Sequence, residues 1–232
     1  MPTLMELDRL KDKIADIHVT LDSHRMVDIS HPGWWRDSNG HHPDPFTQIT
    51  AAEVESGTWT TTMPGARTRS LMYLRELETR GRYPHVIWPE HCLVGHWGHN
   101  LLPVLHNELG EWEAQQHKRV HYVYKGTNPG TEHFSAIRAE VPVAEDPATH
   151  PQEDLLNRLS TTTTILVAGQ ARSHCVANTV RDLVDLRPET ANRIVLLTDT
   201  TSDVPSFEAL GETFVADVTA LGMRTSTTTD WA

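Results

Sequence analysis

Short apolar runs rich in β-branched residues alternate along the chain with segments in which apolar residues recur three and four positions apart. The apolar runs predict strands at residues 16–21, 84–88, 119–124, 163–168 and 194–197. The wider spacing predicts helices at residues 3–14, 66–80, 99–117, 175–186 and 206–221. This alternation is typical of a mainly parallel sheet between layers of helices, so we predict a three-layer α/β/α domain.

One long segment interrupts the alternation. Residues 22–64 are rich in Pro, Gly, His and Trp and predict a loop. Loops of this length in compact domains usually serve a function or cover a neighbouring surface. No internal repeat or low-complexity linker divides the chain, so residues 1–232 are expected to form a single domain.

Composition narrows the classes of partner. The formal charge of −11 argues against nucleic acid and favours small ligands. No apolar run is long enough to span a membrane, and the first residues, MPTLMELDRLKDK, lack the apolar core of a signal peptide. The two cysteines of such a chain are more often free than bridged, which indicates a reducing compartment, so we expect a cytoplasmic protein.

Chemically capable residues follow four of the predicted strands. Asp22 and His24 follow the first strand, His91 the second, Lys125 the third and Cys175 the fourth. Ligands of such sheets bind beyond the carboxyl ends of the strands. We therefore expect these four segments to meet at one edge of the sheet.

Cys175 lies where a strand, a turn and a helix are predicted to meet. Unpaired N–H groups at a helix start favour a thiolate and can hold a developing oxyanion. Lys125, just before Gly126, can lower the pKa of a nearby thiol if it points into a cleft. The alternatives are an inert buried cysteine and a solvated lysine.

Asp22 and His24 are two positions apart, so in extended chain their side chains project to the same side. His91 can supply a third metal ligand and His31 a fourth. Imidazole and carboxylate together suit Zn²⁺, Fe²⁺ or Mn²⁺. The alternative is that these histidines and the aspartate are ordinary loop residues. Trp88 can be interpreted either as a core residue or as part of a pocket wall.

Four short segments together carry a family resemblance. They are residues 19–24 (VTLDSH), 88–92 (WPEHC), 124–126 (YKG) and 169–176 (GQARSHCV). In this order and at this spacing they resemble the nicotinamidase and isochorismatase-like cysteine hydrolases, over most of the chain. The resemblance implies an α/β fold around a six-stranded parallel sheet.

The resemblance also assigns the catalytic roles. Cys175 would attack the carboxamide carbon with the assistance of Lys125. The backbone N–H groups of Ala171 and Cys175 would form the oxyanion hole, with a cis peptide bond before Ala171.

The metal motif resembles the nicotinamidase branch, in which the ion binds the pyridine nitrogen. Asp22, His24 and His91 would be its ligands, and His31 resembles the additional histidine of some members. Trp88 would pack against the pyridine ring. The isochorismatase branch lacks this set of ligands.

Two departures from the family pattern are visible. The segment 32–64, with Trp34 and Trp35, is longer than in a small nicotinamidase and favours a changed substrate. The family also begins with a central strand that ends in the general-base Asp, and no counterpart is found here. We therefore expect that the start of the sequence is too late, that the chain is a fragment, or that another segment fills the gap.

The leading hypothesis is a nicotinamidase, which converts nicotinamide and water into nicotinate and ammonia through a thioester. One alternative is a hydrolase of another small amide, ureido or carbamoyl compound. The other is a catalytically impaired relative that binds a metal or a small ligand. By analogy with the family, a homo-oligomer is also expected.

Overall fold

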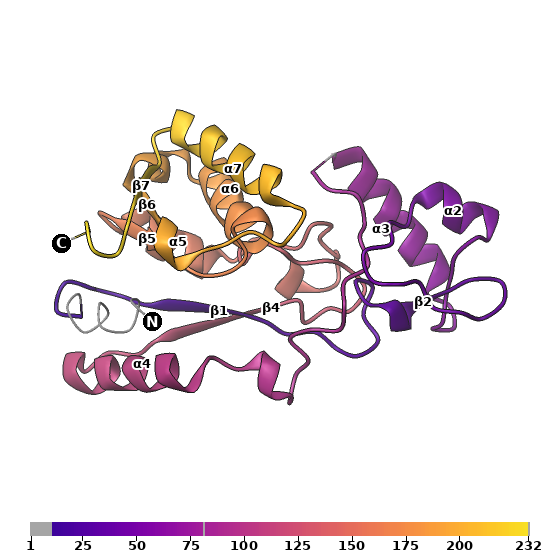
Figure 1. Cartoon of the computed structure of the whole chain (residues 1–232), viewed down its shortest axis with the longest axis horizontal. Helices are drawn as coiled ribbons and strands as arrows, with labels where there is room; N and C mark the ends of the chain where they lie inside the picture. Colours follow the sequence, from indigo (N-terminus) through magenta and orange to yellow (C-terminus); the bar gives the residue numbers. More distant parts are fainter. Residues whose placement is uncertain (1–10, 81, 232) are drawn as a thin grey trace.

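The structure is a computed structural model that describes residues 11–80 and 82–231. Within these residues the parallel strands form two separate sheets (Figure 1). One sheet holds β1 (His18–Asp22) and β4 (His121–Lys125). The other has the order β5 (Ile165–Val167), β6 (Ile194–Leu197), β7 (Arg224–Ser226). The α/β class predicted from the alternating pattern is confirmed.

The register of the first sheet positions the site. β1 and β4 pair from His18 opposite His121 to Asp22 opposite Lys125. Both strands are parallel, so Asp22 and Lys125 end side by side at the same carboxyl edge. The sequence prediction that these two segments converge is thereby explained by the strand register.

Helices cover the two sheets unequally. The helix α4 (Pro103–Gln116) packs on β1 and β4 through Leu109 and Trp112. The second sheet shares a larger apolar core with three helices (Figure 1). These are α5 (Glu153–Thr161), α6 (Ala177–Leu186) and α7 (Glu208–Ala220). Every residue of β6 is buried, as in the central strand of a covered sheet.

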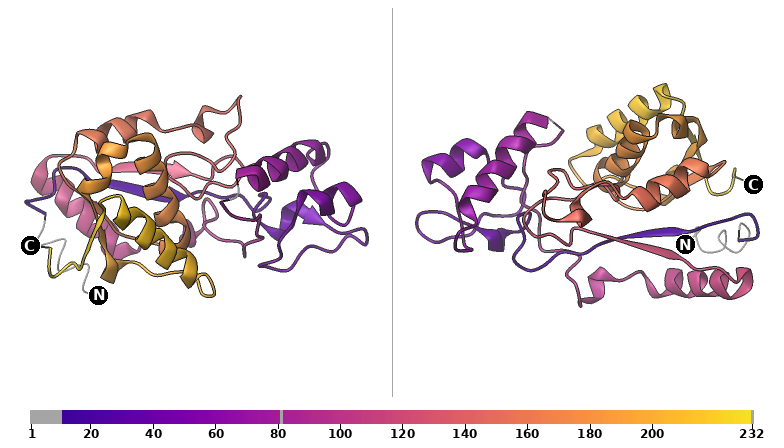
Figure 2. Two further views of the ribbon diagram at one scale, coloured as in Figure 1. Left: turned by 90° about the horizontal axis from the view of Figure 1, so that it is seen from above. Right: turned by 180° about the vertical axis from the view of Figure 1, so that it is seen from behind.

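The segment predicted as a long loop is structured, which corrects that prediction. It contains α2 (Ala51–Ser56) and a short antiparallel pair, β2 (Trp35–Arg36) with β3 (Thr60–Thr61). Together with α3 (Arg67–Arg80) these elements extend to one side of the two sheets (Figures 1 and 2). Trp35, Val54 and Leu74 are fully buried between them, so the tryptophans of this segment form a core of their own.

Two further predictions need correction. The strand predicted at 84–88 joins neither parallel sheet, because Val86 forms only an isolated antiparallel bridge with Gln48. The helix predicted to begin at Cys175 begins at Ala177, after a π-turn at Arg172–Val176. The helix predicted at 3–14 lies largely outside the described residues.

The single sheet implied by the family resemblance is divided. In residues 11–80 and 82–231, β1 pairs only with β4, and β5 pairs only with β6. One edge of β1 and one edge of β5 therefore have no strand partner within the part of the chain that is described. None of the described helices combines the length and apolar character needed to cross a bilayer.

Candidate active site

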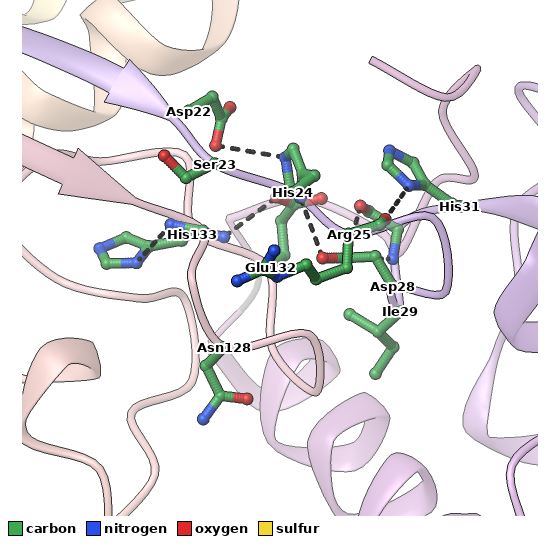
Figure 3. Close-up of polar contacts among 12 residues, drawn as sticks. Asp22, Ser23, His24, Arg25, Asp28, Ile29, His31, Asn128, Glu132 and His133 are labelled. Carbon is green, nitrogen blue, oxygen red and sulfur yellow. Dashed lines mark hydrogen bonds and ion pairs between the residues drawn. The ribbon is translucent and has the colours of Figure 1, made fainter. Parts of the chain in front are cut away.

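Asp22, His24 and His91 form a cluster of potential metal ligands. One ligand atom from each lies within 4.8 Å of the others. Asp22 Oδ1 and His24 Nε2 form an ion pair at 3.2 Å (Figure 3), and neither atom has a hydrogen-bond partner of another residue in the described part of the chain. A tetrahedral ion with bonds of about 2.1 Å places its ligand atoms about 3.4 Å apart. The distance between the Asp22 and His24 atoms is close to this value, so the three residues are candidates to hold a divalent ion.

Hydrogen bonds select the nitrogen that each histidine presents. His24 Nδ1 lies 3.0 Å from Asp28 Oδ2, and His91 Nδ1 lies 2.8 Å from the carbonyl oxygen of Pro89. In both rings these contacts occupy Nδ1 and leave Nε2 for a metal. The donor set of one carboxylate and two imidazoles suits Zn²⁺, Fe²⁺ or Mn²⁺.

His31 lies beside this cluster rather than within it. Its ring centroid is 5.0 Å from that of His24 and 5.2 Å from that of His91. His31 Nδ1 donates to the carbonyl oxygen of Arg25, and Nε2 is 3.2 Å from His91 Nδ1. The described group of three ligands does not include His31, so its assignment as a fourth ligand stays a prediction.

Opposite charges are matched within the cluster. Burial opposes ionisation, but Lys125 and His24 hold the pKa of Asp22 well below its usual range. Burial lowers the pKa of His24, but its polar contacts with Asp22 and Asp28 and the charges of Asp22 and Glu132 raise it to about 11. Burial and the charge of His24 lower the pKa of His91 to about 4. A dication at this place would replace the protonated His24 as the positive charge between the carboxylates.

Gly126 forms one wall of the cluster. Its φ angle is +70°, and a Cβ atom there would lie 2.6 Å from Asp22 Oδ1 and 3.4 Å from His24 Cε1. Glycine is the residue that tolerates this backbone angle without strain. Because Gly126 has no side chain, Asp22 and His24 can occupy the positions that they have here.

Lys125 connects the metal cluster to the nucleophile position. Its buried ammonium group lies 2.6 Å from Asp22 Oδ2 and donates to the carbonyl oxygen of His133 at 2.8 Å. Burial raises the pKa of Cys175 to about 11, although the charge and hydrogen bond of Lys125 lower it. The thiolate expected from a helix start is therefore not favoured, since Cys175 lies in the π-turn and burial has the larger effect.

The turn before α6 has the backbone expected of an oxyanion site. The peptide bond between Gln170 and Ala171 is cis, as the family resemblance implies. Among the described residues the Ala171 N–H has no hydrogen-bond acceptor, whereas the N–H groups of His174 and Val176 both donate to the Ala171 carbonyl oxygen. The roles of Ala171 and Cys175 N–H in holding an oxyanion stay a prediction that this backbone permits.

An aromatic wall lies next to Cys175. The ring of His174 contacts those of Trp88, Phe134 and Phe207 with centroid distances of 5.1, 5.4 and 5.1 Å. Burial lowers the pKa of His174 to about 4, so this ring is neutral. Trp88 is a buried member of this wall, and its indole N–H has no partner among the described residues. Its contact with a pyridine ring stays a prediction.

Sequence reasoning missed two buried carboxylates near His24, namely Asp28 and Glu132 (Figure 3). Asp28 lies four positions after His24, and that spacing is the signal that was available. Glu132 gave no such signal, because only folding brings residue 132 close to residue 24. Burial raises the pKa of Glu132 to about 7, and its charge acts on both His24 and Cys175.

Comparisons with known proteins place the fold. No protein-family model matches the sequence, and no curated protein matches it either. The yeast nicotinamidase bound to the inhibitor nicotinaldehyde is similar at a TM-score of 0.63 and 17% identity, over 97% of this chain and 86% of that one. A nicotinamidase and pyrazinamidase from Acinetobacter baumanii is similar at 0.61 and 17%, over 100% and 86%. A pyrazinamidase from Pyrococcus horikoshii in complex with zinc is similar at 0.52 and 16%, over 97% and 83%.

At this level of identity the likeness establishes the fold. The chain has the α/β fold of the nicotinamidases and pyrazinamidases, and the family resemblance drawn from its four short segments is confirmed to that extent. The fold alone does not determine the reaction, the metal or the substrate, which depend on the residues of the site.

Proposed function

We propose that this protein is a metal-assisted cysteine amidohydrolase that converts nicotinamide and water into nicotinate and ammonia. One observation carries the proposal: a single carboxylate joins the metal cluster to the nucleophile position. Asp22 Oδ1 faces His24 Nε2, and Asp22 Oδ2 binds Lys125, whose charge acts on Cys175. Similarity of fold to nicotinamidases and pyrazinamidases supports a pyridine or pyrazine carboxamide as substrate.

The reaction needs one covalent intermediate. Cys175 Sγ attacks the carboxamide carbon, the C–N bond breaks, and the thiol proton leaves with the amino group as ammonia. Water then attacks the thioester carbon, the C–S bond breaks, and the thiol is restored as nicotinate is released. The N–H groups of Ala171 and Cys175 stabilise the developing oxyanion. Trp88 would orient the ring. Asp22, His24 and His91 would hold a divalent ion, which would supply Lewis-acid chemistry when bound.

Ammonia release tests this proposal directly. The protein is loaded in turn with Zn²⁺, Fe²⁺ and Mn²⁺ and incubated with nicotinamide, pyrazinamide and a panel of ureido and carbamoyl compounds. We expect ammonia from nicotinamide, dependent on the metal and abolished by Cys175→Ala. Ammonia from the ureido or carbamoyl compounds alone would assign the other substrate class, which the length of the segment 32–64 favours. No ammonia from any compound would refute the hydrolase.

A second candidate function is a metal-dependent binding protein without turnover. Burial raises the pKa of Cys175 to about 11, and the family's general-base Asp has no counterpart in the sequence. Both observations favour an inactive thiol. This candidate predicts that metal and nicotinamide bind, as measured by calorimetry, while no ammonia is released.

A further inference from the structure

A carboxylate outside the ligand set lies against the metal cluster. Asp28 Oδ2 is 3.0 Å from His24 Nδ1, and both side chains are 1% exposed. Figure 3 shows Asp28 and Asp22 at opposite sides of the His24 ring. The ring is thus held at Nδ1 by Asp28 while Nε2 faces the ligand atom of Asp22.

The other oxygen of Asp28 fixes the turn that follows. Asp28 Oδ1 accepts hydrogen bonds from the backbone N–H of Ser30 at 3.1 Å and from its hydroxyl at 2.9 Å. The carbonyl oxygen of Ser30 in turn accepts from the backbone N–H of Trp88 at 2.7 Å. One buried carboxylate therefore links the ligand His24 to the turn beside it and, through Ser30, to the aromatic wall.

We propose that Asp28 is a positioning residue that keeps the His24 proton on Nδ1 and so reserves the Nε2 lone pair for the metal. The inference rests on the metal-binding part of the proposed function. A carboxylate only accepts hydrogen bonds when ionised, so Asp28 requires a proton on Nδ1. Groups that orient a ligating histidine in this way typically contribute about 10- to 100-fold to metal affinity.

Asp28→Asn separates this role from a purely structural one. The amide oxygen can still accept from Ser30, so the turn is retained. The amide NH₂ donates, however, and pairs best with an unprotonated His24 Nδ1, which places the proton on the metal-facing Nε2. We expect the affinity for Zn²⁺, measured by competition with a chromogenic chelator, to fall about 10- to 100-fold.

The chain offers a matched control in Asp37 and His41. They have the same four-residue separation and lie 3.4 Å apart, but the His41 side chain is 78% exposed. Asp37 also accepts from the backbone N–H groups of Asn39 and His41, as Asp28 does from Ser30. Asp37→Asn should leave Zn²⁺ affinity unchanged.

A spectroscopic measurement tests the inference without a mutation. In the Zn²⁺-loaded protein, the His24 Nδ1 proton should give a slowly exchanging, strongly downfield NMR signal, identified by selective ¹⁵N labelling of histidine and by its loss in His24→Gln. Absence of this signal, or equal Zn²⁺ affinity of Asp28→Asn and the unmodified protein, would overturn the inference. If the unmodified protein binds no metal, it is the proposed function that fails instead.

Discussion

The two parallel sheets each carry one half of the site and hold it by different means. Cys175 follows β5, in a sheet whose central strand β6 is buried throughout under α6 and α7. Asp22 ends β1, in a two-stranded sheet whose residues are mostly half-buried. The nucleophile half is positioned by apolar packing, whereas the metal half is positioned by buried ion pairs and hydrogen bonds to Lys125 and His24.

The difference shows that order in a site does not require a deep apolar core. Buried polar groups that satisfy one another also define a single arrangement. Lys125 links the two halves, because it pairs with Asp22 and its charge acts on Cys175. The nucleophile half is also held to the segment that follows α3: Tyr83 donates to the carbonyl oxygen of Ser173 at 3.2 Å, and Arg82 pairs with Asp182 at 2.9 Å.

The largest expected effect is a loss of turnover, caused by a substitution in the nucleophile half that leaves the metal half intact. Cys175→Ser should lower turnover of nicotinamide by at least about 10³-fold, because the covalent step is lost. Zn²⁺ affinity should be unchanged, since Cys175 is not among the three ligands. Ammonia release and chelator competition measure the two quantities, with Cys92→Ser as the control. A parallel loss of metal affinity would show that the halves are not independent.

The next effect tests the ion pairing of the metal half. Lys125→Met removes the cation that pairs with Asp22 Oδ2 and leaves only His24 beside that buried carboxylate. The free energy of unfolding of the metal-free protein should therefore fall by about 3–5 kcal/mol. Arg75 and Glu55 form an exposed ion pair of similar length, 2.7 Å. Arg75→Met breaks this pair and should lower the free energy of unfolding by less than about 1 kcal/mol. Urea unfolding at neutral pH measures both. Equal losses would contradict the contrast between buried and exposed pairs.

The nucleophile half can be tested by its pH dependence. Alkylation requires the thiolate, and the pKa of Cys175 is raised to about 11. In a Cys92→Ser background the iodoacetamide rate should therefore rise about 100-fold between pH 7 and pH 9, roughly tenfold per unit. A fast rate independent of pH would show a thiolate already formed, and it would exclude the non-catalytic candidate.

The smallest effect concerns the contact between the nucleophile half and the segment that follows α3. Tyr83→Phe removes the hydroxyl that donates to Ser173 and accepts from Arg181. The expected loss is about 1 kcal/mol in unfolding free energy, with a rise in KM larger than the fall in kcat. Thermal unfolding and steady-state kinetics provide the two readouts. No change in either would mean that packing alone holds this segment against the turn that carries Cys175.

Local patterns predicted much of this arrangement. The strand at 194–197 and the helix at 66–80 follow from apolar periodicity, and four short motifs predicted the convergence of Asp22, His91, Lys125 and Cys175. The prediction of a sheet strand at 84–88 was wrong because Val86 in this apolar run pairs with Gln48 and not with a parallel strand. Which segments pair depends on the tertiary fold and not on the local pattern. The core around Trp35 was missed because its members are separated by tens of residues with no common period.

The thiol environment could not be predicted for a similar reason. Helix-start geometry suggested a lowered pKa for Cys175, but burial is set by the whole fold and acts in the opposite direction. The role of Asp28 also required coordinates, because spacing alone does not distinguish it from Asp37, which has the same relation to a histidine on the surface.

Gly126 has a consequence for how relatives of this chain are interpreted. A single methyl group there would contact Asp22 Oδ1 at 2.6 Å, closer than atoms normally approach. A chain with alanine at this position would keep every ligand residue in its sequence and yet lose the space in which the ligands meet. Selection on metal binding would thus act at a residue that makes no bond to the metal, and a search based only on ligands would count such a chain as a metalloprotein.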